Sequence, residues 1–260
     1  MDLNLTGRHV LITGASQGIG EELARAFAEE GCSLHIVARS GDRLDELKSE
    51  IVAKHPVRVT ATAVDITEEG AVERIVDEAG DVDVLVNNAG TIPSGNLWQV
   101  DAKAWRDGWP LKCFGYVDLC RAFYPSMKAR GGGVILNNIG NGGEVCDPDY
   151  IAGATGNASL MAFTRALGGS SLDDNIRVLG INPGPVDTSR IYKMLKQRAA
   201  KVLGDEGRYE ELLERYPLNR PAHVREIVDM FLFLASDRSA YTTGTIITID
   251  GGIASRRSVI

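Results

Sequence analysis

Short apolar runs rich in valine and isoleucine alternate with longer segments of helical periodicity along the chain. The apolar runs, which predict strands, are residues 8–13, 33–38, 57–64, 82–86, 133–138, 176–181 and 244–249. The helical segments between them are residues 18–30, 42–55, 68–79, 101–129, 152–170 and 222–236. Strands that are apolar on both faces and each followed by a helix predict an α/β fold with a seven-stranded parallel sheet flanked by helices.

No linker rich in Ser and Pro and no internal repeat interrupts this alternation, so residues 1–260 are predicted to form a single Rossmann-like, doubly wound domain. Segment 186–220 departs from the rhythm, because it is rich in Lys, Arg and Glu and lies between a strand end and the next helix. Ligands of open α/β sheets bind beyond the carboxyl ends of the strands. We therefore predict that this segment is a substrate lid; a solvated helical insertion is the alternative.

Charge and composition argue against several classes of function. The 260 residues include 35 acidic and 28 basic side chains, a net charge of −7 without a Lys/Arg cluster, which disfavours nucleic-acid binding. No apolar run approaches the roughly 18 residues of a membrane span. The four cysteines and four histidines lack metal-ligand spacing, so we expect no metal centre and the reduced thiols of a cytoplasmic protein.

A glycine-rich loop follows the first predicted strand and opens the first helix. Its sequence, from Thr13 to Gly20, is Thr-Gly-Ala-Ser-Gln-Gly-Ile-Gly. Glycines allow a tight turn and a close approach of the backbone to a pyrophosphate, and a helix N-terminus offers unpaired N–H groups to the phosphates. This context predicts a dinucleotide site. The loop residues assigned to it are Gly14, Ser16, Gln17, Gly18, Ile19 and Gly20.

The three-residue gap between Gly14 and Gly18 resembles that of the short-chain dehydrogenase/reductase family, and further motifs of that family follow in order. They are Asp65-Ile66, Asn87-Asn88-Ala89-Gly90, Asn182-Pro183-Gly184-Pro185-Val186-Asp187-Thr188 and Asp250-Gly251-Gly252, each after a predicted strand. The resemblance implies that Asp65 and Ile66 flank the adenine of the cofactor. It further implies that the middle and the nicotinamide end of the cofactor contact Asn88, Ala89, Gly90, Pro183, Gly184, Val186 and Thr188.

The end of the second predicted strand bears on the choice between NAD and NADP. An acidic residue there would pair with the ribose hydroxyls of NAD, but the sequence carries Arg39. Arg39 can form a charge-assisted fork with a 2′-phosphate; an arginine that only opens a surface loop is the alternative. Gln17 stands where many NADP-preferring relatives carry a basic residue. We predict NADP as the preferred cofactor and NAD as the alternative.

The acid–base residues of the family do not stand at their usual positions. Reduction of a carbonyl needs a proton donor at the developing alkoxide, and the resemblance implies a Tyr-x-x-x-Lys pair in the helix after the fifth strand, a Ser before it and an Asn on the preceding helix. The predicted helix after the fifth strand, residues 152–170, contains no Tyr-x-x-x-Lys pair. The register that agrees with both flanks places Gly153 at the tyrosine, Asn157 at the lysine and Gly140 at the serine. A second register places Tyr150 at the tyrosine and Ala154 at the lysine.

Lys112 occupies the asparagine position on segment 101–129, so the Asn and Lys of the family are exchanged between two helices. Our hypothesis is that Lys112 and Asn157 form a swapped pair beside the nicotinamide ribose, where burial would depress the pKa of the lysine. A solvent-exposed Lys112 is the alternative. Pro110 predicts an irregular turn nearby. With Tyr150 as the best stand-in for the phenol, the candidate catalytic residues are Lys112, Asn157 and Tyr150.

Three functions are compatible with these residues. The intact nucleotide loop favours an NAD(P)(H)-dependent oxidoreductase that acts on a small carbonyl or alcohol substrate through a non-standard acid–base site. The alternatives are a non-redox enzyme on the same scaffold, such as a lyase, dehydratase or hydrolase, and a catalytically inactive dinucleotide-binding protein. The resemblance implies a homo-oligomer, either a tetramer or a dimer. The expected ligand besides the cofactor is a small-molecule substrate.

Overall fold

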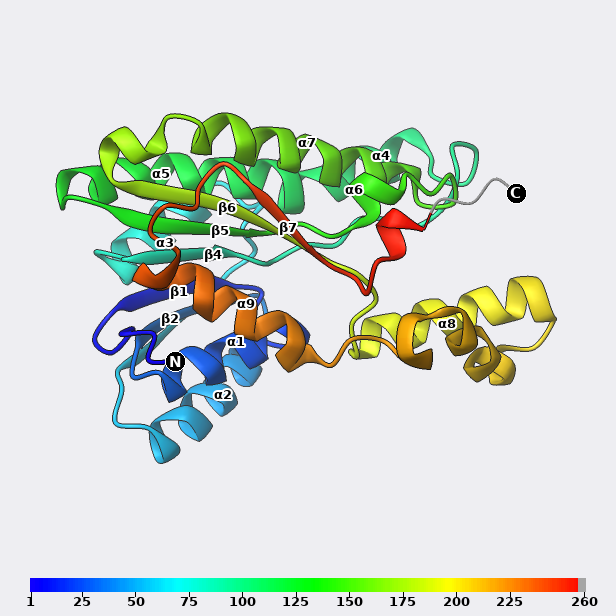
Figure 1. Ribbon diagram of the computed structural model, residues 1–260, viewed down its shortest axis with the longest axis horizontal. Helices are drawn as coiled ribbons and strands as arrows, with labels where there is room; N and C mark the ends of the chain where they lie inside the picture. Colours follow the sequence, from blue (N-terminus) through cyan, green and yellow to red (C-terminus); the bar gives the residue numbers. More distant parts are fainter. Residues whose placement is uncertain (257–260) are drawn as a thin grey trace.

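The computed structural model describes residues 1–256, and its centre is a seven-stranded sheet covered by helices on both faces (Figure 1). The strands are β1 (His9–Thr13), β2 (Ser33–Ala38), β3 (Val59–Ala63), β4 (Val84–Asn87), β5 (Gly133–Asn138), β6 (Ile176–Pro183) and β7 (Ile246–Ile249). They lie in the order β3-β2-β1-β4-β5-β6-β7, and all neighbouring pairs are parallel. The predicted α/β class and seven-stranded parallel sheet are confirmed.

The helices pack in two layers, one on each face of the sheet. The α-helices are α1 (Gly18–Glu29), α2 (Gly41–Lys54), α3 (Ala71–Ala79), α4 (Ala102–Trp109), α5 (Gly115–Ala129), α6 (Gly142–Val145), α7 (Ile151–Gly168), α8 (Ser189–Leu203) and α9 (Val224–Ala235). Helices α1, α2 and α9 cover one face, and α3, α5 and α7 cover the other (Figure 1). None of the helices in residues 1–256 combines the length and the apolar character needed to cross a membrane.

Successive side chains of a strand point to opposite faces of the sheet, so each strand contributes to the hydrophobic cores on both faces. In β1, Val10 and Ile12 belong to the core cluster shared with α1, α2 and α9, whereas Leu11 belongs to the cluster shared with α3 and α5. The chain runs from β1 to β3 in one direction and from β4 to β7 in the other, so the strand order reverses between β1 and β4. In doubly wound sheets this reversal opens a ligand crevice at the carboxyl ends of the strands.

The segment predicted as one helix over 101–129 is divided into α4 and α5 by a π-helical turn, Pro110–Phe114. Pro110 has no N–H to donate, and the N–H of Gly115 bonds to the Pro110 carbonyl, five residues back, so the turn is wider than an α-helical one. The irregular turn expected at Pro110 is therefore present. Lys112 lies in the middle of it.

Segment 186–220 forms a helical excursion beyond the carboxyl ends of the strands (Figure 1). Helix α8 packs against a 3₁₀ segment, Glu206–Arg215, around a small hydrophobic cluster of its own that includes Leu195, Ala199 and Leu212. The cluster lies apart from the two main core clusters, so this excursion is held together internally.

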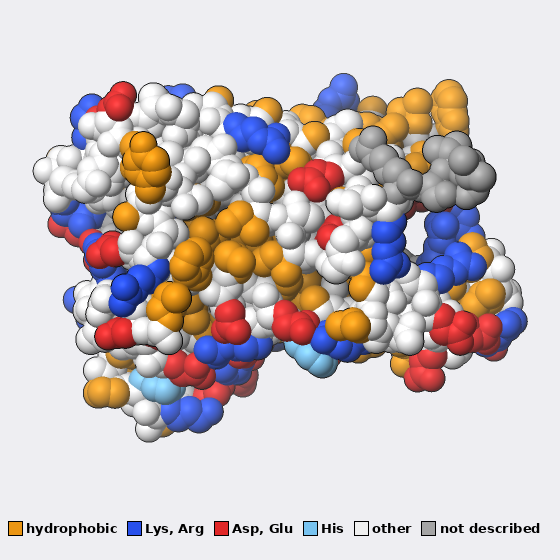
Figure 2. Space-filling model, in the orientation of Figure 1, with side chains coloured by type: hydrophobic (Ala, Val, Ile, Leu, Met, Phe, Trp, Pro, Cys, Tyr) orange, Lys and Arg blue, Asp and Glu red, His pale blue; other side chains and the backbone are white. Residues whose placement is uncertain are grey.

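Strand β7 forms one edge of the sheet, and its four residues, Ile246–Ile249, are only partly buried. Hydrophobic side chains gather at the centre of the face shown in Figure 2, where β7 crosses in Figure 1. Unpaired edge strands with apolar side chains favour association with another surface.

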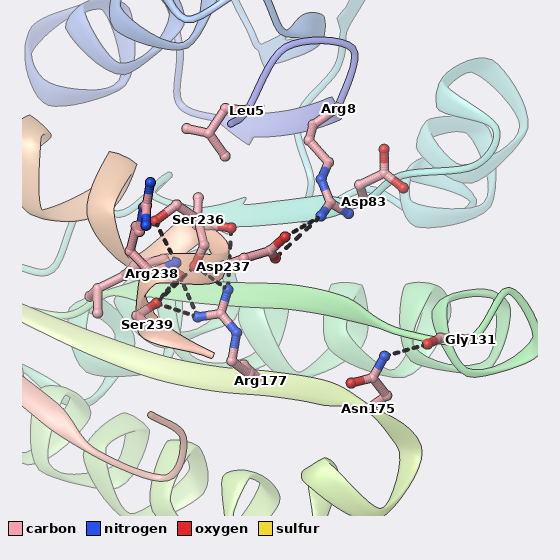
Figure 3. A network of polar contacts seen from close by, with 12 residues as sticks. Leu5, Arg8, Asp83, Gly131, Asn175, Arg177, Ser236, Asp237, Arg238 and Ser239 are labelled. Carbon is pink, nitrogen blue, oxygen red and sulfur yellow. Dashed lines mark hydrogen bonds and ion pairs between the residues drawn. The ribbon is translucent and has the colours of Figure 1, made fainter. Parts of the chain in front are cut away.

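A buried arginine, Arg177, holds the C-terminal end of α9 near the amino ends of the strands, on the side of the sheet away from the crevice (Figure 3). Arg177, in β6, donates to the carbonyl oxygens of Leu234, Ala235 (3.2 Å) and Ser236 (3.0 Å), and also to the hydroxyl of Ser239. These are the carbonyls that the last turn of α9 leaves without helical partners. Arg8 reaches Asp237 in the same network, but that ion pair is exposed to solvent.

Replacing Arg177 with Met should lower the free energy of unfolding by about 3 kcal/mol, because several buried acceptors lose a charged donor. The matched variant Arg8→Met removes only an exposed ion pair and should cost less than about 1 kcal/mol. Urea denaturation followed by circular dichroism measures both. Equal effects of the two substitutions would contradict the role assigned to Arg177.

Candidate active site

The glycine-rich loop lies in the crevice between β1 and β4, and close packing requires its glycines. Gly14 and Gly18 have φ angles of +68° and +60°. A Cβ atom on Gly20 would lie 2.2 Å from the Gly14 carbonyl oxygen, and one on Gly14 would lie 2.8 Å from Cα of Ala89. The side chain of Gln17, the N-cap residue of α1, makes no capping bond. The N–H groups of the first turn of α1 are therefore left for an anionic ligand.

Asn88 clamps this loop to the ends of the neighbouring strands. Its Nδ2 donates to the carbonyl oxygens of Thr13 (2.9 Å) and Gly14 (3.3 Å), and its Oδ1 accepts from Asn138 Nδ2 (2.7 Å). The side chain of Asn88 thus has a structural role in addition to the cofactor contact implied by the family. The backbone of Ala89 and Gly90, which follow it, borders the crevice.

Two arginines, Arg39 and Arg43, stand at the end of the crevice where the resemblance places the adenine of the cofactor. Arg39 lies 3.7 Å from Asp65, and Arg43 donates to the side chain of Gln17 (3.2 Å). Burial alone would raise the pKa of Asp65, but hydrogen bonds from Thr67 and the nearby Arg39 hold the pKa below its ordinary value. Sequence reasoning missed Arg43, although its place four residues after Arg39, in the first turn of α2, was a usable signal.

The remaining predicted cofactor residues lie around the same crevice. Ile66 is buried in the cluster shared with α5, and Ile19 packs against the cluster on the other face of the sheet. Ser16 borders a hollow together with Gln17 and Arg43. A Cβ atom on Gly18 would lie 3.4 Å from Thr188, so the loop after β6 reaches the nucleotide loop. This second loop contains Pro183, Gly184, Val186 and Thr188.

Lys112 points inward from the widened turn. Its Nζ donates to the carbonyl oxygens of Ile139 (2.6 Å) and Asn138 (3.2 Å), and its Cδ is 2.8 Å from where a Cβ on Gly90 would lie. Burial, reinforced by the charge of Arg190, lowers the pKa of Lys112 to about 7. The lysine is therefore not a side chain of the solvent-exposed helix surface.

Asn157, on α7, approaches the same place from the opposite side. It is buried, and its Nδ2 lies 3.2 Å from the position that a Cβ on Gly140 would take. Its Oδ1 is buried without a hydrogen-bond partner in the described part of the chain. Lys112 and Asn157 thus border residues 139–140 from two helices, with no direct hydrogen bond between them in residues 1–256.

The ring of Tyr150 lies on the bare backbone of Gly153. A Cβ atom on Gly153 would be 1.9 Å from Cζ of Tyr150 and 2.2 Å from its Cε1. The phenol therefore fills the space in which a side chain at position 153 would begin. A parallel bridge holds the backbone here, since Gly95 accepts from the N–H of Ile151 (3.2 Å) and donates to the carbonyl of Asp149 (2.8 Å).

Arg190, in the first turn of α8, was not among the sequence candidates. Its guanidinium donates to the Tyr150 hydroxyl oxygen and to the Gly90 carbonyl oxygen, both at 3.4 Å. Farther along α8, Arg198 (2.8 Å) and Lys201 (3.5 Å) contact the carboxylate of Asp149. Helix α8 is thereby tied to the loop that carries Tyr150. Only the position of Arg190, two residues after the motif that ends at Thr188, hinted at this contact.

These groups include the kinds of donors and acceptors that a dinucleotide-dependent proton transfer requires. The crevice combines a glycine cradle and a free helix N-terminus with a phenol, an amine and a guanidinium beyond the strand ends. Because Arg190 can only donate, the Tyr150 oxygen is the acceptor in their contact, and its own proton makes no hydrogen bond within residues 1–256. No group of three or more His, Cys, Asp or Glu side chains in that range is arranged to hold a metal ion.

Comparison with known proteins identifies the family. A family model described as enoyl-(acyl carrier protein) reductase matches residues 14–254. L-Sorbose reductase from Gluconobacter frateurii, whose crystal structure contains NADPH and L-sorbose, is 34% identical with a TM-score of 0.91, and the match covers 99% of this chain and 100% of that one.

Two curated relatives agree with this assignment. The oxidoreductase UcpA of Salmonella typhimurium is 34% identical over 260 residues, which cover 98% of this chain and 97% of the relative. The 2-keto-3-deoxy-L-fuconate dehydrogenase of Xanthomonas campestris is 31% identical, covering 95% of this chain and 80% of the relative. With the parallel sheet and the glycine cradle described above, these matches show that the chain belongs to the short-chain dehydrogenase/reductase family of oxidoreductases.

Proposed function

We propose that this protein interconverts a ketone and a secondary alcohol on a sugar-like small molecule, with NADP(H) as cofactor and Tyr150 as the proton-transferring group. The observation that carries the proposal is the phenol of Tyr150 in the space of a side chain at Gly153, the position of the family's tyrosine. The names of two relatives, an L-sorbose reductase and a 2-keto-3-deoxy-L-fuconate dehydrogenase, support a sugar-like substrate. The intact nucleotide cradle favours this redox reaction over a non-redox or inactive protein.

The residues of the crevice fit the cofactor. The amino end of α1 would hold the diphosphate, and Arg39 and Arg43 would hold the 2′-phosphate of NADP. The buried Oδ1 of Asn157, which has no hydrogen-bond partner among residues 1–256, would accept a hydrogen bond from a cofactor hydroxyl. When bound, the reduced cofactor supplies a hydride to the carbonyl carbon of the substrate.

Tyr150 supplies the proton in this scheme. Its hydroxyl proton is not engaged by the described residues, so it can pass to the carbonyl oxygen as negative charge develops there. In the oxidation direction, the same oxygen receives the proton of the alcohol. The parallel bridge to Gly95 and the contact with Gly153 fix the ring, so the phenol keeps one orientation during turnover.

Lys112 provides positive charge from the other side of residues 139–140. Protonated Nζ donates to two carbonyl oxygens in the chain segment that leads into Gly140, the position of the family's serine. A charge in this partly buried place stabilises negative charge on the substrate oxygen more strongly than a charge in water would. Lys112 and Asn157 thus divide the tasks that the family gives to its lysine and asparagine.

The whole chain would act as one dinucleotide-binding domain with segment 186–220 as its lid. Support comes from the separate hydrophobic cluster of this segment and from the ion pairs that join α8 to Asp149. We also propose that the protein is a homo-oligomer. The partly exposed apolar edge strand β7 and the patch around it supply a surface for a second copy (Figure 2).

Replacing Tyr150 with Phe removes only the hydroxyl and should lower kcat for ketone reduction about 10²- to 10⁴-fold, because general acid catalysis is lost. NADPH binding, followed by cofactor fluorescence, should stay unchanged. Tyr241→Phe is the matched control, since that side chain is 97% exposed. Retention of the parent kcat by Tyr150→Phe would assign the proton transfer to another group.

The pKa of about 7 for Lys112 predicts a pH effect on ketone reduction. The ammonium form prevails below this value, so kcat should fall as the pH rises through about 7. Lys112→Met keeps the aliphatic packing against Gly90 and should be slow at all pH values without that inflection. A variant that binds both ligands and shows the kcat and pH profile of the parent would remove Lys112 from the mechanism.

The arginines at the adenine end should set the preference for NADP. Arg39→Ala and Arg43→Ala should each weaken NADPH binding about tenfold or more and leave NADH binding nearly unchanged, because a charge-assisted contact to the 2′-phosphate is lost. Fluorescence titration of each reduced cofactor measures the Kd. Arg225→Ala, on α9, serves as the control because Arg225 pairs with Glu29 and Asp229. Equal losses for NADPH and NADH would contradict this assignment.

A further inference from the structure

Both hydrogen-bond acceptors of the Arg190 guanidinium are neutral. Its two hydrogen-bond acceptors are the Tyr150 hydroxyl and the Gly90 carbonyl, both at 3.4 Å, the long end of hydrogen-bond range. It forms no ion pair with any carboxylate of residues 1–256. An arginine has five N–H donors, so most of the donors of Arg190, which is an exposed side chain, remain available to water or to a ligand beside the phenol.

The acidic side chains of Asp149 and Asp187, next to α8, contact groups other than Arg190. Helix α8 carries positive side chains and no acidic ones, namely Arg190, Lys193, Lys196, Arg198 and Lys201. The carboxylate of Asp149, on the loop that faces this helix, is taken by Arg198 and Lys201. Asp187 accepts the hydroxyl of Tyr192. Arg190 is therefore the α8 cation that contacts the phenol of the proposed site and lacks a counter-charge in the described part of the chain.

The positive field of Arg190 reaches the interior of the site. Its charge is one of the causes that lower the pKa of Lys112, after burial. Two cations thus face the region of Tyr150 and Gly90 from different elements, α8 and the turn at 110–114. The amino end of α8 adds a partial positive charge, because the side chain of its N-cap residue, Thr188, makes no capping bond. Such a place is stabilised by a bound anion.

We propose that Arg190 binds a carboxylate of the substrate, so that the substrate is a sugar acid rather than a neutral sugar. The two parallel N–H groups at one edge of a guanidinium match the two oxygens of a carboxylate. This inference rests on the proposed function, because the space beside Tyr150 belongs to the substrate only if Tyr150 is the proton donor. Because Arg190 lies on α8, within the proposed lid, binding of the substrate carboxylate would draw this segment toward the site.

Two ketoses that differ in one group test the proposal. 5-Keto-D-gluconate is L-sorbose in which the terminal hydroxymethyl group remote from the ketone is oxidised to a carboxylate. With NADPH, the parent protein should show a kcat/KM about tenfold or more higher for the acid. Arg190→Gln should lower the ratio of the two kcat/KM values about 10- to 100-fold, mainly through KM for the acid. Lys193→Gln, which removes one positive charge from the same helix, should leave the ratio unchanged.

A binding measurement makes the test independent of turnover. Protein saturated with NADP⁺ is titrated by calorimetry with D-gluconate and with D-sorbitol, its neutral counterpart. We expect D-gluconate to bind more tightly than D-sorbitol and to lose this advantage in Arg190→Gln. Absence of D-gluconate binding would overturn the inference. So would an equal effect of Arg190→Gln on both ketoses, which would indicate a role toward the phenol alone, or a loss of NADPH affinity in that variant.

The outcomes separate this inference from the proposed function. Arg190-dependent binding of D-gluconate without reduction of either ketose would support the inference and contradict the reaction assigned to Tyr150. Reduction of both ketoses with a ratio that Arg190→Gln does not change would support the reaction and overturn the inference.

Discussion

The contact between the ring of Tyr150 and the backbone of Gly153 sets the geometry of the whole site. The ring lies closer to Cα of Gly153 than any side chain at that position would allow. Tyr150 is the N-cap residue of α7, with φ −135° and ψ 38°, so its backbone is outside the helix and its side chain can fold back over the first turn. The phenol that we propose as the proton donor can thus be carried three residues before the position that the resemblance assigns to the tyrosine of the family, because Gly153 has no side chain there.

Gly140 and Gly142 leave space for Tyr150 and Asn157 in the same way that Gly153 leaves space for the Tyr150 ring. A Cβ on Gly142 would lie 3.2 Å from the Tyr150 ring and 3.3 Å from Asn157 Nδ2, and one on Gly140 would lie 3.2 Å from the same nitrogen. These distances are tighter than ordinary van der Waals contact, so Tyr150 and Asn157 use room that larger residues would fill. Glycine at positions 140 and 153, where the resemblance implies a serine and a tyrosine, is therefore compatible with the rebuilt site that we propose, because each glycine leaves space for a neighbouring side chain.

The sequence was sufficient for the architecture and for the nucleotide loop. Apolar runs near 8–13 and 82–86 and the glycines after residue 13 depend on local periodicity and turn chemistry, which a single chain displays directly. Tyr150 could be proposed from its place before the helix, but its contact with Gly153 depends on backbone angles that sequence patterns do not reveal. Arg43 and Arg190 were missed for a related reason: their partners lie 26 and 40 residues away in the chain.

The sequence alone does not decide whether Lys112 is buried or exposed, and the fold is needed to interpret this position. In sequence it is one polar residue in a segment that Pro110 makes irregular, and burial and exposure fit the pattern equally well. The π-helical turn decides between them, because it turns the side chain toward the carbonyls of residues 138 and 139. The protonated amine there adds positive charge to that of Arg190, and like charges repel each other. Negative charge on a ligand would offset this repulsion, which agrees with the carboxylate that we propose as the partner of Arg190.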